Sequence, residues 1–277
     1  MNSISSCADD ERARRADEND GRKAAGTRRE YPNIIEVICH KVERIEEEAF
    51  DSCPRLRRVI MRGVKIVERG AFADCQALED VECGKLEIIG DSAFARCKSL
   101  RNINLPSVRI VEGWAFYDLT GVKFSSELER FDQGTFSSCA SLERITIPLK
   151  DDMITADNIF MGCENLKQLD LVKGEELRET IAALHFEEWR NEMNREIDSI
   201  NRNLPTADAG GGYGNQGEKA QVIRGWLRSV RDKMIHYIAE HQRVLDVAAA
   251  TLELILPRDL VMKNILSFLE LPSYMLE

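Results

Sequence analysis

The chain repeats one pattern of apolar and polar positions six times between residues 49 and 166. The phrases that carry it are AFDSCPRL at 49–56, AFADCQAL at 71–78, AFARCKSL at 93–100, AFYDLTGV at 115–122, TFSSCASL at 135–142 and IFMGCENL at 159–166. Their phenylalanines follow one another at intervals of 22, 22, 22, 20 and 24 residues. Self-similarity at a period of this size predicts a stacked array of short structural repeats.

A short alternating segment predicts one strand in each repeat. In Leu100, Ile103 and Leu105, for example, polar residues separate the apolar ones. Apolar residues two apart are typical of a strand with one buried face. A repeat this short cannot bury that face alone, so neighbouring repeats must cover it. Stacking then places each phenylalanine on the next, and we expect this column to be a principal source of stability.

The fourth repeat is shorter than the others and tests this alignment. If three residues are missing after Leu119, then Val122, Phe124 and Leu128 fall back into the apolar columns of the other repeats. The sequence therefore predicts a local irregularity at this repeat, with a kink in the stack.

The period becomes helical after Lys173 and Gly174. Apolar residues three to five apart predict one helix from Leu177 to about Pro205 and a longer one from Glu218 to Ile255. Residues 205–217 are a flexible linker by composition. We expect an antiparallel hairpin that caps the repeat stack or pairs with a partner helix or a second copy of the chain.

The expected organisation has three parts. Residues 1–30 are dense in both charge signs and predict a disordered tail. Residues 31–172 are the repeats, and 173–277 are the helical C-terminal region. The fold class is an α/β-type solenoid of short parallel strands followed by an α-helical hairpin and a C-terminal helix.

The repeat resembles the BspA-like leucine-rich repeat family over about residues 34–171. The pattern I-x-x-x-A-F-x-x-C-x-x-L-x-x-[IV]-x-[IL] is carried by Ile89, Phe94, Cys97, Leu100 and Ile103, and by their counterparts in other repeats. The resemblance implies a parallel-strand solenoid that binds proteins. It implies no enzyme activity and brings no catalytic residues with it.

The open face of the strands is the first candidate binding surface. Its polar columns mix both charge signs and contain no aromatic cluster, so they offer a surface without marking a hot spot. The candidate residues are Arg58, Asp80, Glu82, Asn102, Asn104, Arg144, Gln168 and Asp170.

Two further charged columns follow the repeat. An acidic strip, a candidate docking site for a basic segment, consists of Glu46, Glu68, Glu112 and Asp132. The simpler interpretation, which we prefer, is that each acid caps the turn beginning near the repeated phrase. A column of alternating sign predicts a ladder of ion pairs across the repeats, made by Glu43, Lys65, Glu87, Arg109 and Glu129.

The cysteine column is expected to be structural. Cys53, Cys75, Cys97, Cys139 and Cys163 share one position, and Leu119 replaces them in the short repeat. Metal sites use paired C-x₂-C ligands, which are absent from this sequence. A disulfide between adjacent repeats is geometrically imaginable, but small buried thiols at a tight turn are the simpler interpretation.

No catalytic, cofactor or metal motif was found. Gly212, Gly214 and Gly217 match the dinucleotide fingerprint in spacing but lack its strand and βαβ context, so a hinge is the better interpretation. His236 and His241 are five apart and form no zinc motif. We therefore expect a protein that is not an enzyme and needs no cofactor.

Charge and apolar content limit the partners and the location. The net charge of −10 argues against general binding to nucleic acid or anionic lipid. No apolar window approaches the ~18 residues of a membrane span, and the N-terminus lacks the apolar run of a signal peptide. The sequence predicts an intracellular, cytoplasmic protein that binds a protein partner.

The last segment allows one alternative. Residues 256–272, LPRDLVMKNILSFLELP, are similar to the opening helix of an F-box. That resemblance implies an adaptor presenting a repeat-bound client to a ubiquitin ligase. The simpler interpretation, which we favour, is a final amphipathic helix that Pro257 begins and that docks on the hairpin.

Overall fold

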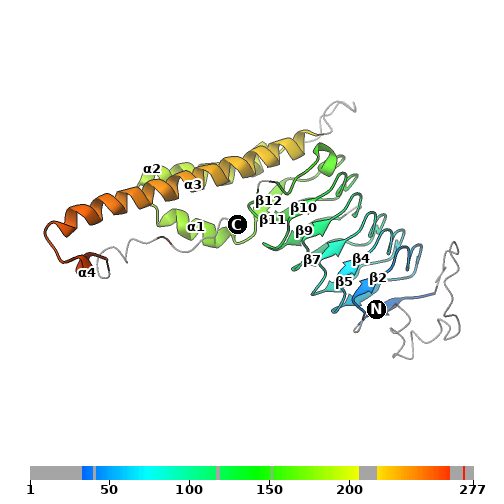
Figure 1. The fold of residues 1–277 in the computed structure, drawn as a ribbon. Coiled ribbons are helices and arrows are strands. Elements are labelled where there is room, and N and C mark those ends of the chain that lie inside the picture. The colour runs from blue at the N-terminus through cyan, green and yellow to red at the C-terminus, as the bar shows by residue number, and fades with distance from the viewer. Residues whose placement is uncertain are drawn as a thin grey trace. The chain divides into compact units, whose positions relative to one another are not determined.

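A computed structural model describes residues 33–39, 42–116, 119–150, 152–205, 217–262 and 271 (Figure 1). The expected tail, 1–30, and all of the expected linker except its two end residues lie outside this range. The chain divides into two compact units. The first comprises Met1–Pro148, Asp152–Val172 and Leu204–Val222, and the second comprises Leu149–Asp151, Lys173–Asn203 and Ile223–Glu277.

The first unit is a solenoid of stacked coils, as the sequence predicts. Its longer strands are β1 (Glu36–Ile38), β3 (Arg58–Met61), β5 (Asp80–Cys83), β7 (Asn102–Leu105), β9 (Gly121–Phe124), β11 (Arg144–Ile147) and β12 (Gln168–Leu171). They pair in parallel in the orders β1-β3-β5 and β7-β9-β11-β12. Their side chains alternate between the core and the open face because successive residues of a strand point to opposite sides.

A third parallel sheet lines the other side of the first five coils. It consists of two-residue strands in chain order, namely β2 (Arg44–Ile45), β4 (Ile66–Val67), β6 (Ile88–Ile89), β8 (Ile110–Val111) and β10 (Arg130–Phe131). A 3₁₀-helix, η2 (Asp157–Phe160), occupies the turn of the last repeat. The core of the unit lies between this sheet and the two sheets of longer strands.

The repeated phenylalanines form a continuous stack inside the coils. Their ring centroids are 5.3 to 5.9 Å apart, and neighbouring ring planes differ by at most 9°. The rings belong to Phe50, Phe72, Phe94, Phe116, Phe136 and Phe160, all of which are buried. This arrangement confirms the predicted column and shows why the chain repeats an aromatic residue at one position.

The short fourth repeat keeps its apolar register. Val122 pairs with Ile103 and Phe124 pairs with Leu105, as the three-residue gap predicts. The ladder of the longer strands runs unbroken from β7 through β9 to β12, and its division lies one repeat earlier, between β5 and β7. The hydrogen-bond ladder of the longer strands is therefore interrupted one repeat before the short one. The kink expected at the short repeat stays a prediction.

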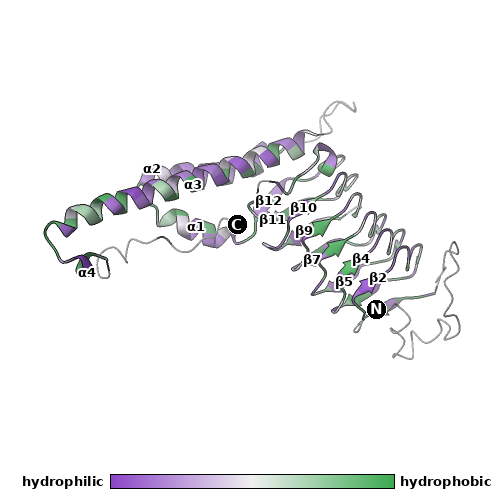
Figure 2. Cartoon of the chain, viewed as in Figure 1, coloured by the Kyte–Doolittle hydropathy of each residue, from purple (hydrophilic) through white to green (hydrophobic). Residues whose placement is uncertain are grey.

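The second unit is helical, and its helices have amphipathic sequences (Figure 2). The helices are α1 (Gly174–Ala182), α2 (Glu187–Asn203), α3 (Glu218–Glu253) and α4 (Arg258–Leu260). The first turn of α3 belongs to the first unit, where Lys219 Nζ donates to the carbonyl of Leu166 at 3.4 Å. Lys233 and Glu196 illustrate the contacts between α2 and α3, with a salt bridge of 2.8 Å.

The expectation of one helix from Leu177 to Pro205 is wrong, because the chain breaks between α1 and α2. The backbone N–H of His185 donates to Nδ1 of the buried His241 on α3, at 3.1 Å, instead of continuing the helix. Arg190 donates to the carbonyls of Leu184 and His185, at 2.6 and 3.3 Å. These contacts satisfy backbone groups that the break would otherwise leave unpaired.

Helices α2 and α3 form the predicted antiparallel hairpin. Trp226 Nε1 donates to the carbonyl of Glu196 at 2.9 Å. Further along α3, Tyr237 donates to Glu192 at 2.6 Å and stacks on Trp189 with ring centroids 5.3 Å apart. Residue numbers along α3 therefore increase while those of their contacts on α2 decrease, so the two helices run in opposite directions.

Candidate functional site

The open face of the longer strands carries all eight residues that the sequence nominates for binding. The first outward column includes Arg58 paired with Asp80 on one sheet, and Asn102, Gly121, Arg144 and Gln168 in succession on the other. The second outward column lies two residues later in each strand and includes Glu82, Asn104 and Asp170. The two columns are hereafter called the strand face.

Many charges of the strand face pair with one another. Arg58 lies 3.0 Å from Asp80 and 3.7 Å from Glu82. Arg144 lies 3.7 Å from Asp170, and its Nη2 donates to Gln168 Oε1 at 2.6 Å. The charged side chains of these ion pairs are more than a third exposed, so each pair is worth only about 0–1 kcal/mol.

The middle of the strand face is polar and exposed. Asn104 on β7 is the register partner of Lys123 on β9, and both side chains are exposed. Lys123 is absent from the residues that the sequence nominates, although its strand position alone would have identified it. The two side chains offer hydrogen-bond donors and one positive charge between the two groups of ion pairs.

Two side chains of the acidic strip accept hydrogen bonds from backbone N–H groups. Glu68 accepts a hydrogen bond from the N–H of Glu47, and Glu112 accepts one from the N–H of Asp91, both at 3.0 Å. Each acid thus caps the turn of the preceding repeat rather than its own. Glu68 also pairs with Arg44.

The alternating ion ladder is present at its two ends among the described residues. Lys65 lies 3.5 Å from Glu43, and Arg109 pairs with Glu129. Glu87, between them, belongs to no ion pair within the described part of the chain. The ladder therefore joins the first two repeats and the fourth and fifth, without running through the whole stack.

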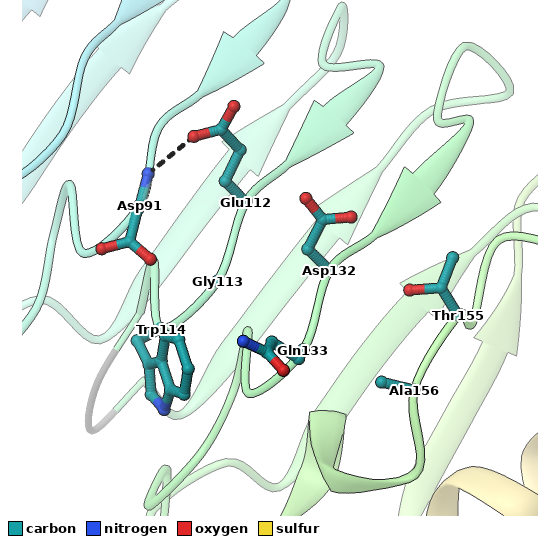
Figure 3. Close-up of a pocket in the computed structure, with 8 residues that line it drawn as sticks. All are labelled: Asp91, Glu112, Gly113, Trp114, Asp132, Gln133, Thr155 and Ala156. Carbon is teal, nitrogen blue, oxygen red and sulfur yellow. Dashed lines mark hydrogen bonds between the residues drawn. The ribbon is translucent and has the colours of Figure 1, made fainter.

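A pocket of about 490 Å³ lies beside the acidic strip, and the sequence did not predict it (Figure 3). Trp114 lines it and is 43% exposed. Three carboxylates from three successive repeats also line it, namely Asp91, Glu112 and Asp132. The remaining lining residues are Gly113, Gln133, Thr155 and Ala156.

Trp114 differs from the residues at the same position of the other repeats, and this difference is the sequence feature that could have indicated the pocket. Two residues before the phenylalanine, the sixth repeat has Asn158, and the first five repeats have Glu48, Gly70, Ser92, Trp114 and Gly134. All five residues have a positive φ, and Trp114 has a φ of 49°. A bulky side chain in the left-handed region is an outlier, which a comparison of the repeats at this position would have revealed.

The seven cysteines in the described part of the chain are buried free thiols, as the sequence indicates. Cys97 Sγ donates to the carbonyl of Phe72 at 3.1 Å, and Cys163 Sγ donates to that of Phe136 at 3.0 Å. Burial raises the pKa of both thiols, and it raises the pKa of Cys83 to about 12. Such thiols are poor nucleophiles because the reactive species is the thiolate.

Other chemistry is limited within the described part of the chain. No group of three or more His, Cys, Asp or Glu side chains there could hold a metal ion. No helix among those residues is long and apolar enough to cross a membrane.

The C-terminal segment adds little to the functional picture. Of the F-box-like stretch 256–272, the structure describes only 256–262 and 271. Pro257 precedes α4, and Val261 is buried in a cluster with Leu245 of α3, as a docking helix requires. Leu254, close to this cluster in sequence but not part of it, is 85% exposed. Self-association through these helices stays a prediction.

Comparison with solved structures finds bacterial leucine-rich repeat proteins. The T. pallidum leucine rich repeat protein is 29% identical, with 49% of this chain and 69% of that chain covered and a TM-score of 0.46. A leucine rich cell surface protein from Faecalibacterium prausnitzii A2-165 is also 29% identical, with 52% and 33% covered and a TM-score of 0.34. The comparison with curated proteins finds no match.

The repeats also match a known family. Residues 43–167 match the family described as the BspA type leucine rich repeat region, in six copies. The matched range contains the phenylalanine stack and most of the strand face. Residues 43–167 therefore form a BspA-type leucine-rich repeat region.

Proposed function

We propose that the chain is a non-enzymatic protein-binding module, acting as a scaffold, and that it binds its partner through the strand face. The observation that carries the proposal is the register of β7, β9, β11 and β12, which holds two outward columns of polar side chains on one continuous sheet. Leucine-rich repeats generally serve protein interaction, and this region is a repeat of that kind.

The energetics of the strand face favour a polar, reversible interface. Its ion pairs are exposed and weak, so a partner can replace them at little cost. Charge complementarity across such an interface mainly sets the association rate and the choice of partner. We expect binding to weaken as ionic strength rises, because exposed charges are screened within about 8 Å at physiological salt.

A charge reversal on the strand face tests the proposal. Lys123→Glu changes an exposed residue in the second column, and Lys98→Glu makes the same change at an exposed turn residue outside both columns. Wild type and both variants are used to capture proteins from lysate of the native cells, with quantitative mass spectrometry. Loss of the same partners with Lys123→Glu alone, at unchanged thermal stability, supports the proposal. Equal recovery by all three proteins rejects it.

The cellular location also needs a test. The sequence predicts an intracellular protein, whereas the similar Faecalibacterium protein is described as a cell surface protein. Protease treatment of intact cells, followed by immunoblotting, separates the two: an intracellular chain survives the treatment and a surface chain is degraded.

A further inference from the structure

We propose that the pocket beside Trp114 binds the guanidinium group of an arginine side chain on a protein partner. This site is separate from the strand face, since it follows the two-residue strands rather than the longer ones. The inference rests on the proposed function only in that the ligand belongs to a protein. The first observation behind it is the lining itself, which has three carboxylates, one indole and no basic side chain.

The indole of Trp114 is held in place by the next repeat. A Cβ atom added to Gly134 would be 2.7 Å from Trp114 Nε1 and 2.9 Å from Trp114 Cε2. The ring therefore rests directly on the Gly134 backbone, which immobilises it while leaving 43% of the residue exposed. A fixed, exposed aromatic ring is the surface on which a guanidinium group stacks.

The carboxylates keep acceptor capacity for a cation. Glu112 uses Oε2 to accept from the Asp91 N–H, and Asp91 uses Oδ1 to accept from Ser92 Oγ at 2.9 Å. Asp132 lies 3.2 Å from Arg130, whose side chain is half exposed and does not line the pocket. A carboxylate has about four lone-pair positions, so each of these contacts leaves positions open toward the pocket.

The pocket differs from the equivalent place in the first repeats, where the chain supplies its own cations. There Arg69 pairs with Glu47 and Glu48, and Arg44 pairs with Glu68. The residues that replace Arg69 in the next three repeats are Asp91, Gly113 and Gln133. The same acidic column thus continues without its arginine, and Trp114 stands beside the position where the guanidinium would lie.

Arginine fits this lining better than lysine. Its planar guanidinium stacks on an indole and can donate to two carboxylates at once, whereas an ammonium is a compact and strongly hydrated charge. Gly113 keeps the floor open, because a Cβ atom there would lie 3.2 Å from Asp91 Oδ2 and 3.0 Å from the Gln133 carbonyl oxygen. Side chains at this position would fill the space that the ligand needs.

The test uses the full chain with ¹⁵N-labelled tryptophan and follows the indole N–H signals by NMR. Trp114→Phe identifies the Trp114 signal among those of the three tryptophans. The probes are blocked tripeptides with arginine, lysine or citrulline between two glycines. Citrulline has nearly the shape of arginine without its charge. We expect a saturable shift of the Trp114 signal with the arginine peptide, a weaker response to lysine and none to citrulline.

Two conservative variants examine the carboxylates. Glu112→Gln keeps an acceptor oxygen for the Asp91 N–H, so thermal unfolding should be unchanged, and Asp132→Asn is compared with it. Each variant should weaken arginine-peptide binding by up to about fivefold, because one exposed ion pair is worth roughly 0.2–1 kcal/mol.

Three results would overturn the inference. They are an unmoved Trp114 signal with the arginine peptide, an equal shift with the citrulline peptide, and an equal shift with the lysine peptide. These outcomes are independent of the strand face. Failure of the arginine peptide to bind, together with loss of partners in Lys123→Glu, would reject the pocket and keep the strand face. Peptide binding together with unchanged partners in Lys123→Glu would reject the strand face and keep the pocket.

Discussion

The indole of Trp114 packs on the backbone of Gly134, one repeat further along the stack, so closely that a Cβ atom at 134 would be 2.7 Å from Trp114 Nε1. Gly134 also has a φ of +65°, a conformation that costs other residues roughly 1–2 kcal/mol. Gly134→Ala should therefore lower the free energy of unfolding by more than this backbone cost alone. Urea unfolding measures the change.

Two comparisons separate the clash with the indole from the backbone cost of Gly134→Ala. Gly70→Ala has the same backbone cost, with a φ of +60°, but its Cβ would lie 3.4 Å from the flexible Glu48 side chain. Gly134→Ala in a Trp114→Ser background should cost about as much as Gly70→Ala. An equal cost for Gly134→Ala with and without the indole would show that the two residues are not in contact.

The phenylalanine stack should be the main source of stability in the first unit. Phe94→Ala removes a fully buried ring from the middle of the stack and should cost about 3–5 kcal/mol, the range of large core truncations. Phe186→Ala is the matched control, because Phe186 is 42% exposed. Urea denaturation followed by circular dichroism gives both values. Similar losses at the two positions would contradict a stability centred on the stack.

The buried thiols should make the fold sensitive to alkali. The pKa of Cys83 is raised from 9.0 to about 12 by burial, so the folded protein keeps a proton that the unfolded chain releases above pH 9. This stabilising contribution is fully present below pH 9 and is lost between pH 9 and 12, at about 1.4 kcal/mol per pH unit.

The measurement compares urea midpoints from pH 8 to 11 for wild type and Cys83→Ala. The variant should lose stability less steeply above pH 9, because one titrating thiol is missing. Parallel curves for the two proteins would mean that Cys83 has an ordinary pKa in the folded state.

The hairpin should depend on the hydrogen bond between its helices. Trp226→Phe removes the bond from Nε1 to the Glu196 carbonyl at the α2–α3 contact and should cost roughly 1–2 kcal/mol. Trp114→Phe, which alters an exposed ring, is the same substitution without that loss. Thermal unfolding of both variants should show the larger decrease for Trp226→Phe, and the opposite order would rule out this role.

The repeat architecture could be predicted from sequence because each column is read six times. A single Phe or Cys carries little information, but Phe94 recurs with Cys97 and Leu100 at the same spacing in other repeats. Even the short repeat was aligned correctly, since Val122 and Phe124 return to their columns. Periodicity also predicted the hairpin, because α2 and α3 both show apolar residues at helical spacing.

The features that escaped prediction depend on contacts between distant residues. Apolar spacing continues through Ala183 to Phe186, so it could not reveal the break that His241 creates by accepting from the His185 N–H. The division between β5 and β7 is a matter of backbone geometry that side-chain pattern does not encode. The pocket combines residues from four repeats, and only Trp114 stands out from its column in the sequence.

The central claim is that the strand face contacts the partner, and site-specific photocrosslinking tests it most directly. A benzophenone amino acid is placed at Asn104, on the strand face, or at Lys98, in an exposed turn, in the full chain made in its native cells. Irradiation should join the partner to the protein with the label at 104 and leave the protein labelled at 98 uncrosslinked. Equal crosslinking at both positions, or crosslinking at 98 alone, would contradict the account.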